Sequence, residues 1–248
     1  MPKPSDLVEA PRHSAIIVAA GSSTRMGGKV RKPYLKLRGK PILTWTVAAL
    51  GKVSGLQQIV LVTRPEDRRR AAAAARLARL PKSIRLDFAD GGARRQDSVF
   101  NGLKATDARS ELILIQDAAR PFPKPETMLQ ACDAARRVGA SILACRVKDT
   151  VKREAGASAD MLPAIQETVP RAGLWLAQTP QIFKRQLILS IFERLMRERP
   201  NQEVTDDASI CELFGQPVAL VESSDTNFKV TRPEDLLIAE AYLKLKMV

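Results

Sequence analysis

A short apolar run from Ala15 to Ala20 most constrains what this chain can fold into. The run reads AIIVAA, has β-branched residues at its centre and ends at Gly21. A brief, uninterrupted apolar segment that stops at a glycine is typical of a strand buried on both faces of a parallel sheet. The run therefore predicts a sheet covered by other elements on both sides.

The residues that follow this run have the composition of a phosphate-binding loop. Small and polar residues from Gly21 through Ser22 to Thr24 come first, and a buried strand ending in such a turn exposes backbone N–H groups to an anion. Four cations come next and favour a polyphosphate, namely Arg25, Lys29, Arg31 and Lys32. On these residues alone, an ordinary strand-to-helix turn with solvated charges remains an alternative.

Two common phosphate motifs are absent from this stretch. A Walker A loop reads GxxxxGK[ST], but Gly21 and Gly27 are one residue too far apart, and Val30 occupies the hydroxyl position. The dinucleotide fingerprint GxGxxG fails because Ser23 stands in place of the second glycine. The site, if it binds a nucleotide, belongs to another class.

Further apolar runs alternate with helical patterns along the chain. The predicted strands lie at residues 58–63, 84–89, 111–116 and 141–147, and predicted helices include 41–50, 65–80 and 125–138. This rhythm predicts an α/β fold with a Rossmann-like mixed, mostly parallel sheet flanked by helices on both faces. In such sheets ligands bind beyond the carboxyl ends of the strands.

Two loops after these strands carry chemistry-bearing residues. The first contains Gly91-Gly92, which permits close backbone approach, and Asp97-Ser98, which we expect to cap a helix. The second begins with Gln116 and Asp117 and continues to Arg120. An acid and a base just past a buried strand predict a metal or phosphate contact, and an ion pair within the turn is the alternative.

Residues 146–170 differ from the rest of the chain. They read as two alternating strands around a turn at 156–158, with little apolar material to form a core. Because an isolated hairpin is marginally stable in water, we predict a projecting β-arm that needs a partner surface, and hence a homodimer.

The last third returns to helical patterns. Helices are predicted at 185–199 and 206–214, the second with Thr205 as its N-cap, and a strand at 217–221. A capping-box pattern from Thr231 to Glu234 starts a final helix that runs to about Lys246. Because this cap pins the preceding backbone, it also fixes the direction of Lys229.

Length and composition limit the class of protein. The 248 residues, 45% of them hydrophobic, predict one domain over 14–248 behind a tail at 1–13. The apolar runs are far shorter than the roughly 20 residues of a membrane span, and the N-terminus lacks the apolar region of a secretory signal. Three widely spaced cysteines indicate buried thiols rather than disulfides or zinc ligands, so a cytoplasmic location is expected.

Charge and histidine content narrow the chemistry. His13 is the only histidine in the sequence, which argues against histidine acid–base catalysis and multi-histidine metal sites. The net charge of +13 raises a nucleic-acid surface as an alternative. Aromatic residues make up only 4%, however, and many arginines lie on one predicted helix, so a solvated helix face is favoured.

Eight motifs in order resemble one enzyme family. The resemblance covers Ser14 to Leu243, and the motifs read AAGSSTRMG, KPYL, GGARRQDSV, QDAARPF, VKDTVKR, TVPRAGLWLAQTPQ, VTDDASICELFG and NFKVTRPEDL. Together they are similar to the 2-C-methyl-D-erythritol 4-phosphate cytidylyltransferases of the non-mevalonate isoprenoid pathway. The resemblance implies transfer of CMP from CTP to methylerythritol phosphate, with Mg²⁺ as cofactor and pyrophosphate as the second product.

The resemblance also implies roles for individual residues. Arg25 and Lys32 would stabilise charge on the triphosphate, while Arg171 and Lys229 would hold methylerythritol phosphate for in-line attack. Thr150 and Arg120 would assist substrate binding, with Thr150 and Arg171 reaching the site of a partner subunit. Asp117 would act near the metal and the ribose. The nucleotide would be surrounded by Ala19, Ala20, Gly21, Ser22, Gly92, Ser98, Asp117 and Ala118.

Departures and rival functions remain open. Gln116 stands where this family often has histidine, and Phe100 where arginine or tyrosine is more usual. A ribitol-5-phosphate cytidylyltransferase of the same fold is the nearest alternative, although Ala118-Ala119 favours methylerythritol phosphate. A basic nucleic-acid-binding module is a more distant one. A glycosyltransferase would want an acidic pair such as DxD, which the residues around Asp117 do not provide.

Overall fold

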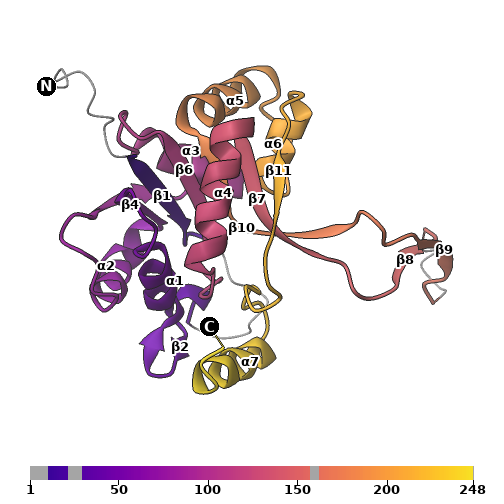
Figure 1. Ribbon diagram of the computed structural model, residues 1–248, viewed down its shortest axis with the longest axis horizontal. Coiled ribbons are helices and arrows are strands. Elements are labelled where there is room, and N and C mark those ends of the chain that lie inside the picture. Colours follow the sequence, from indigo (N-terminus) through magenta and orange to yellow (C-terminus); the bar gives the residue numbers. More distant parts are fainter. Residues whose placement is uncertain (1–10, 22–29, 157–161, 248) are drawn as a thin grey trace, which may run out of the picture.

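A seven-stranded sheet forms the centre of the computed structural model, which describes residues 11–21, 30–156 and 162–247 (Figure 1). Every pairing in this sheet is parallel except the two made by β10, which runs antiparallel to β6 and β7. The strands, in their order across the sheet, are β11 (Ala219–Glu222), β7 (Ala140–Arg146), β10 (Trp175–Lys184), β6 (Leu112–Asp117), β1 (His13–Val18), β4 (Leu56–Thr63) and β5 (Arg85–Asp90). The predicted mixed, mostly parallel sheet is confirmed.

Helices cover both faces of the sheet, as expected. One face packs against α1 (Ile42–Leu50), α2 (Arg68–Arg76) and α4 (Pro125–Val138). The other packs against α3 (Arg95–Lys104), α5 (Arg185–Glu198) and α6 (Asp207–Leu213). Alternate residues of β1 supply the two cores, since Ala15 and Ile17 belong to the first and Ile16 to the second. Strands buried on both faces read as continuous apolar runs, which explains the sequence of this strand.

The carboxyl ends of the parallel strands meet at one edge. Val18 of β1 pairs with Val62 of β4 on one side and with Asp117 of β6 on the other. On the next strand, Thr63 pairs with Asp90. The loops that follow β1, β4, β5 and β6 therefore begin side by side, although the sequence spreads them over about a hundred residues.

Strand β10 was not predicted from the sequence. Its pairing with β7 is interrupted between Ala177 and Gln181, and it contains Pro180, which is unusual inside a central strand. Both features weaken the sequence pattern that would predict a strand. The segment is nevertheless a strand because it pairs with β6 on one side and β7 on the other.

Several helix termini differ from the predictions. The helix expected over 65–80 consists of a 3-10 turn at Pro65–Asp67 and then α2, and Arg79 has a positive φ of 53° that is incompatible with a continuing helix. Asp97 does not precede α3 but lies in its first turn, where its carboxylate accepts from the Arg94 N–H. The N-cap of α6 is Asp206 rather than Thr205, because its carboxylate accepts from the Ser209 N–H.

The predicted arm is a separate two-stranded sheet that projects from the body (Figure 1). Its antiparallel strands are β8 (Val151–Glu154) and β9 (Ile165–Val169), and the residues of both are largely exposed. The last helix, α7 (Pro233–Lys244), lies beside a two-residue hairpin of β2 (Lys36–Leu37) and β3 (Lys40–Pro41). A small core around Leu37, Phe122 and Val230 joins this helix to the sheet body.

Candidate active site

A cleft of about 600 Å³ lies at the carboxyl edge of the sheet. Its volume is within the range of small-molecule sites. The loops after β1, β4, β5 and β6 form its walls, together with Lys32 and the loop that carries Lys229. Nine residues singled out from the sequence line this one cleft, namely Ala19, Ala20, Gly21, Lys32, Gly92, Ser98, Asp117, Ala118 and Lys229.

The double glycine after β5 packs closely against its neighbours. A Cβ atom on Gly91 would overlap the Cβ of Ala20, and one on Gly92 would overlap the Cβ of Asp97. Ser98 fixes this loop, because its Oγ accepts from the Gly92 N–H at 2.9 Å and donates to the Arg94 carbonyl at 3.2 Å. The two glycines therefore let backbone, rather than side chains, form this wall of the cleft.

Asp117 lies at the centre of the charges in the cleft. Its Oδ2 accepts from Lys229 Nζ at 2.7 Å, and its Oδ1 lies 3.8 Å from Arg95 Nη2. Arg120 Nε lies 3.8 Å from Oδ2, the oxygen that Lys229 binds. Burial by itself raises the pKa of Asp117, but Lys229, Arg95 and Arg120 outweigh burial and keep the pKa below its ordinary value. The carboxylate is therefore ionised across the neutral pH range.

The position of Lys229 is set by the backbone on both sides of it. The buried Asn227 donates its amide to Gln178 Oε1 at 3.0 Å and to the Thr179 carbonyl at 2.9 Å. After Lys229, the Val230 N–H donates to the Ala119 carbonyl at 2.9 Å. The capping residue of α7 differs from the prediction, because Asp235 rather than Glu234 accepts from the N–H of Arg232.

Lys32 enters the cleft from a short 3-10 helix, Lys32–Tyr34, and its residue surface is only 8% exposed. The preceding residue, Arg31, is anchored by Asp67 and by Glu66, the latter at 2.9 Å. This clamp joins the chain after the first loop to the segment after β4. Arg25 and Ser22, which were predicted for the same site, lie outside the described residues.

Arg120 is not among the residues that line the cleft. Its guanidinium donates to the carbonyls of Asn227 at 2.8 Å and Ala177 at 3.2 Å, and its own carbonyl accepts from the buried Gln116 at 2.9 Å. These hydrogen bonds hold together the backbone segments next to Asp117 and Lys229. The substrate-binding role of Arg120 stays a prediction.

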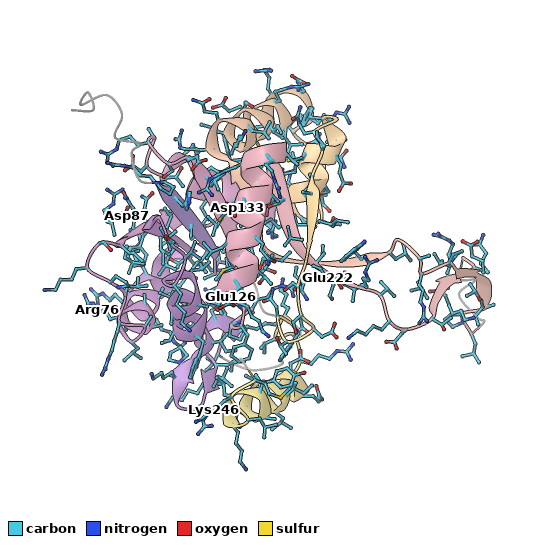
Figure 2. All side chains as sticks on the ribbon, viewed as in Figure 1. Arg76, Asp87, Glu126, Asp133, Glu222 and Lys246 are labelled. Atoms are coloured by element: carbon cyan, nitrogen blue, oxygen red, sulfur yellow. The ribbon has the colours of Figure 1, made fainter. Side chains whose placement is uncertain are left out.

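Arg171 and Thr150 also lie away from the cleft of their own chain. Arg171 donates to the Lys148 carbonyl and lines a second hollow together with Glu222. Figure 2 labels Glu222 near the base of the arm. Thr150 is exposed on the way into the arm. Within one chain, the structure therefore does not bring these two residues to Asp117.

Several cleft residues were not assigned a role from the sequence. Arg64 donates to the Ala20 carbonyl at 3.0 Å, Arg94 is held by Asp97 at 2.8 Å, and Arg95 forms a two-point pair with Asp207 at 3.0 and 2.8 Å. The only sequence signal for Arg94 and Arg95 was their position two and three residues after Gly92, and Arg64 had none. Asp207 gave no signal of its own, because an acid in the first turn of a helix is commonplace.

Two carboxylates of the described residues line the cleft, Glu66 and Asp117. Glu66 is paired with Arg31 at 2.9 Å, so Asp117 is the one that suits a magnesium ion. Among the described residues, no three or more acidic, histidine or cysteine side chains gather as a metal cage. Mg²⁺ bound with a nucleotide usually takes one or two carboxylates and completes its shell with phosphate oxygens and water. Lys229 occupies Oδ2, whereas Arg95 remains beyond hydrogen-bonding distance of Oδ1, so the residues present fit such an ion.

Other predicted features lie away from the cleft. His13 starts β1 at the opposite edge of the sheet, where it is buried, and burial together with Arg136 lowers its pKa. The three cysteines are free and buried, and burial raises the pKa of Cys132 to about 11. No helix within the described part of the chain has both the length and the apolar character needed to cross a membrane.

Comparisons with known proteins agree with this geometry. A family model described as 2-C-methyl-D-erythritol 4-phosphate cytidylyltransferase matches residues 13–245. A protein of that name from Geobacillus kaustophilus is 39% identical over 235 residues, covering 95% of this chain and 98% of its own. A second, from Desulforamulus reducens, is 40% identical over 232 residues, covering 93% of this chain and 95% of its own.

A solved structure extends the match to three dimensions. The crystal structure of 4-diphosphocytidyl-2C-methyl-D-erythritol synthase from Anaerococcus prevotii superposes with a TM-score of 0.78 at 34% identity, covering 94% of this chain and 96% of that one. The match to the family model and these identities both extend over nearly the whole chain. The chain belongs to the 2-C-methyl-D-erythritol 4-phosphate cytidylyltransferase family.

Proposed function

We propose that this chain transfers CMP from CTP to 2-C-methyl-D-erythritol 4-phosphate, giving 4-diphosphocytidyl-2-C-methyl-D-erythritol and pyrophosphate. The observation that carries the proposal is the convergence of Lys32, Lys229, Arg95 and Asp117 on one glycine-walled cleft. Family membership supports the choice of cytidine nucleotide and polyol phosphate.

The chemistry matches the side chains available. A phosphate oxygen of methylerythritol phosphate forms a bond to the α-phosphorus of CTP, and the bond from that phosphorus to the oxygen of pyrophosphate breaks. The attacking phosphate is already ionised, so the reaction needs no strong general base. Catalysis then depends on positioning and on cations that stabilise the spreading negative charge.

The cleft residues take distinct parts in this proposal. The backbone around Ala20, Gly21 and Gly92 surrounds the nucleotide, and Lys32, with Arg25, neutralises the triphosphate. Lys229 binds the attacking phosphate, and Asp117 would hold Mg²⁺ and approach the ribose. Mg²⁺ would add positive charge next to the phosphates when bound.

We also propose that the site is completed by a second copy of the chain. Arg171 and Thr150 are on or beside the arm and away from their own cleft, and the arm strands have too little apolar surface to be stable alone. A homodimer through residues 146–170 would place them against the methylerythritol phosphate of the partner. The domain assignment to 14–248 and a cytoplasmic location belong to the same proposal.

Pyrophosphate release from CTP tests the function. We expect release that depends on both methylerythritol phosphate and Mg²⁺, with much slower release when ribitol 5-phosphate is the acceptor. Faster release with ribitol 5-phosphate would instead identify the chain as a ribitol-5-phosphate cytidylyltransferase. Tight binding of duplex DNA with a steep salt dependence, and no pyrophosphate, would favour the nucleic-acid module instead.

A further inference from the structure

Arg95 lies between two carboxylates that the sequence separates widely. It forms a two-point ion pair with Asp207, at 3.0 and 2.8 Å, and the same Nη2 atom lies 3.8 Å from Oδ1 of Asp117. Its side chain is 28% exposed and lines the cleft, whereas the side chain of Asp207 is fully buried. Arg95 is therefore hydrogen-bonded to the buried Asp207 and is only near Asp117, which lines the cleft.

Asp207 is itself rigidly placed. It is the first residue of α6, and its N–H donates to Oε1 of the buried Gln181 at 2.9 Å. The amide of Gln181 donates in turn to Asp206 at 2.7 Å, and Asp206 caps the helix through Ser209. Strand β10 and the start of α6 thus fix the carboxylate that holds Arg95.

Arg95 is hydrogen-bonded to Asp207 but not to Asp117, and this difference determines whether Oδ1 of Asp117 is accessible. An arginine freed from Asp207 would be partly buried without its partner, and Asp117 is the nearest carboxylate to it. Because an unpaired buried charge is costly, the guanidinium would move to close the 3.8 Å gap. Such a contact would occupy Oδ1, the oxygen of Asp117 that Lys229 does not bind.

We propose that Asp207 is a positioning residue that holds Arg95 away from Asp117 and so keeps Oδ1 available to a divalent cation bound with the nucleotide. This inference rests on the proposed function for the identity of the nucleotide. It assigns a role in the site to a residue that does not line the cleft. Asp207 acts only through Arg95, which distinguishes it from a metal ligand.

Two variants test the restraint. In Asp207→Asn, a crystal structure is expected to show Arg95 at hydrogen-bonding distance from Asp117, about 2.7–3.2 Å. Mn²⁺ affinity in the presence of CTP, measured by electron paramagnetic resonance, should fall by about 10- to 100-fold, as for other supporting partners of a metal site. In the double variant Asp207→Asn with Arg95→Gln, the cation next to Oδ1 of Asp117 is gone, while Lys229 and Arg120 stay on the side of Oδ2. Mn²⁺ affinity should therefore recover.

The double variant separates positioning from a structural role. If Asp207 merely stabilised the fold, removing Arg95 as well would leave Mn²⁺ affinity equally low or lower. Asp133→Asn is the matched control, because it removes another Arg–Asp pair, with Arg136, on α4 and away from the cleft (Figure 2). Thermal unfolding of all variants checks that each is folded, and the double variant buries no unpaired charge.

The outcomes are distinguishable from a failure of the proposed function. If the wild type releases no pyrophosphate but Arg95 closes on Asp117 in Asp207→Asn, the function is wrong and the restraint stands. An Arg95 that stays at its wild-type distance, with Mn²⁺ affinity unchanged, would overturn the inference even in an active enzyme.

Discussion

The cleft and the arm use charged residues in opposite ways. In the cleft, Lys32 and Asp117 are 8% and 13% exposed, and buried strand ends and helix starts hold them in place. On the arm, Arg153 and Glu167 are each more than half exposed and pair across β8 and β9. Among the described residues, the charged side chains of the cleft are therefore held by buried neighbours, whereas those of the arm pair mainly with one another at the surface.

This contrast follows from where each region gets its stability. The loops of the cleft extend from a sheet whose two faces are buried under helices. The arm has exposed apolar side chains, including Leu162 and Ile165, and its described residues contain no helix that could cover them. A two-stranded ribbon of this kind is marginally stable by itself, which is the physical basis of our proposal that the arm completes a site on a second copy of the chain.

The largest expected effect is the loss of Lys32 from the cleft. Lys32→Ala should lower kcat by about 10² or more, the usual result of removing one preorganised charge contact. Lys36→Ala, four residues on and exposed, is the matched control and should retain wild-type turnover. Steady-state turnover with CTP measures both, and a nearly unchanged kcat for Lys32→Ala would remove this residue from the mechanism.

A mixture of two impaired variants tests whether the arm acts on a partner. Arg171→Ala alone should also lose about 10² in turnover. If the arm acts in trans, mixing and refolding it with Lys32→Ala should restore roughly a quarter of wild-type activity, since half of the dimers are mixed and one cleft in each is complete. No recovery would show that Arg171 serves its own chain or none.

A methyl group on a glycine should have a smaller effect that differs between the two regions. Gly91→Ala forces a contact with Ala20, so the KM for CTP should rise about 10-fold or more as both loops shift. Gly156→Ala at the end of the arm meets no atom within 4 Å, so its free energy of unfolding should change by less than about 0.5 kcal/mol. An unaltered KM in Gly91→Ala would show that the two loops can adjust without affecting the nucleotide site.

The smallest expected effect concerns the ion pairs of the arm. Arg153→Ala removes the contact with Glu167, and because both side chains are largely exposed, the free energy of unfolding should fall by less than about 1 kcal/mol. Urea unfolding measures this change. A larger loss would mean that the arm is coupled to the body more strongly than its contacts indicate.

Local sequence patterns determined most of the sheet and much of the site. The apolar runs at β1, β4, β6 and β7 predicted these strands because residues buried on both faces must be apolar throughout. The edge strand β5 is only partly buried and was predicted from a mixed run. The helix at Pro125–Val138 was predicted to the residue, with proline at its start and Gly139 after its end. Small residues and charges after the strands then predicted the edge at which a ligand binds, because parallel strands end together.

The tertiary structure decided which of these charges meet. The contacts of Lys229 with Asp117 and of Arg95 with Asp207 each join residues 112 positions apart, and the insertion of β10 between β6 and β7 fixes where Gln181 supports Asp207. Strand and helix signals depend on close neighbours in sequence, whereas these contacts depend on strand order and on which faces the helices cover. That is why the sequence alone indicated Lys32, Lys229 and Asp117 as site residues but not Arg95 or its pairing with Asp207.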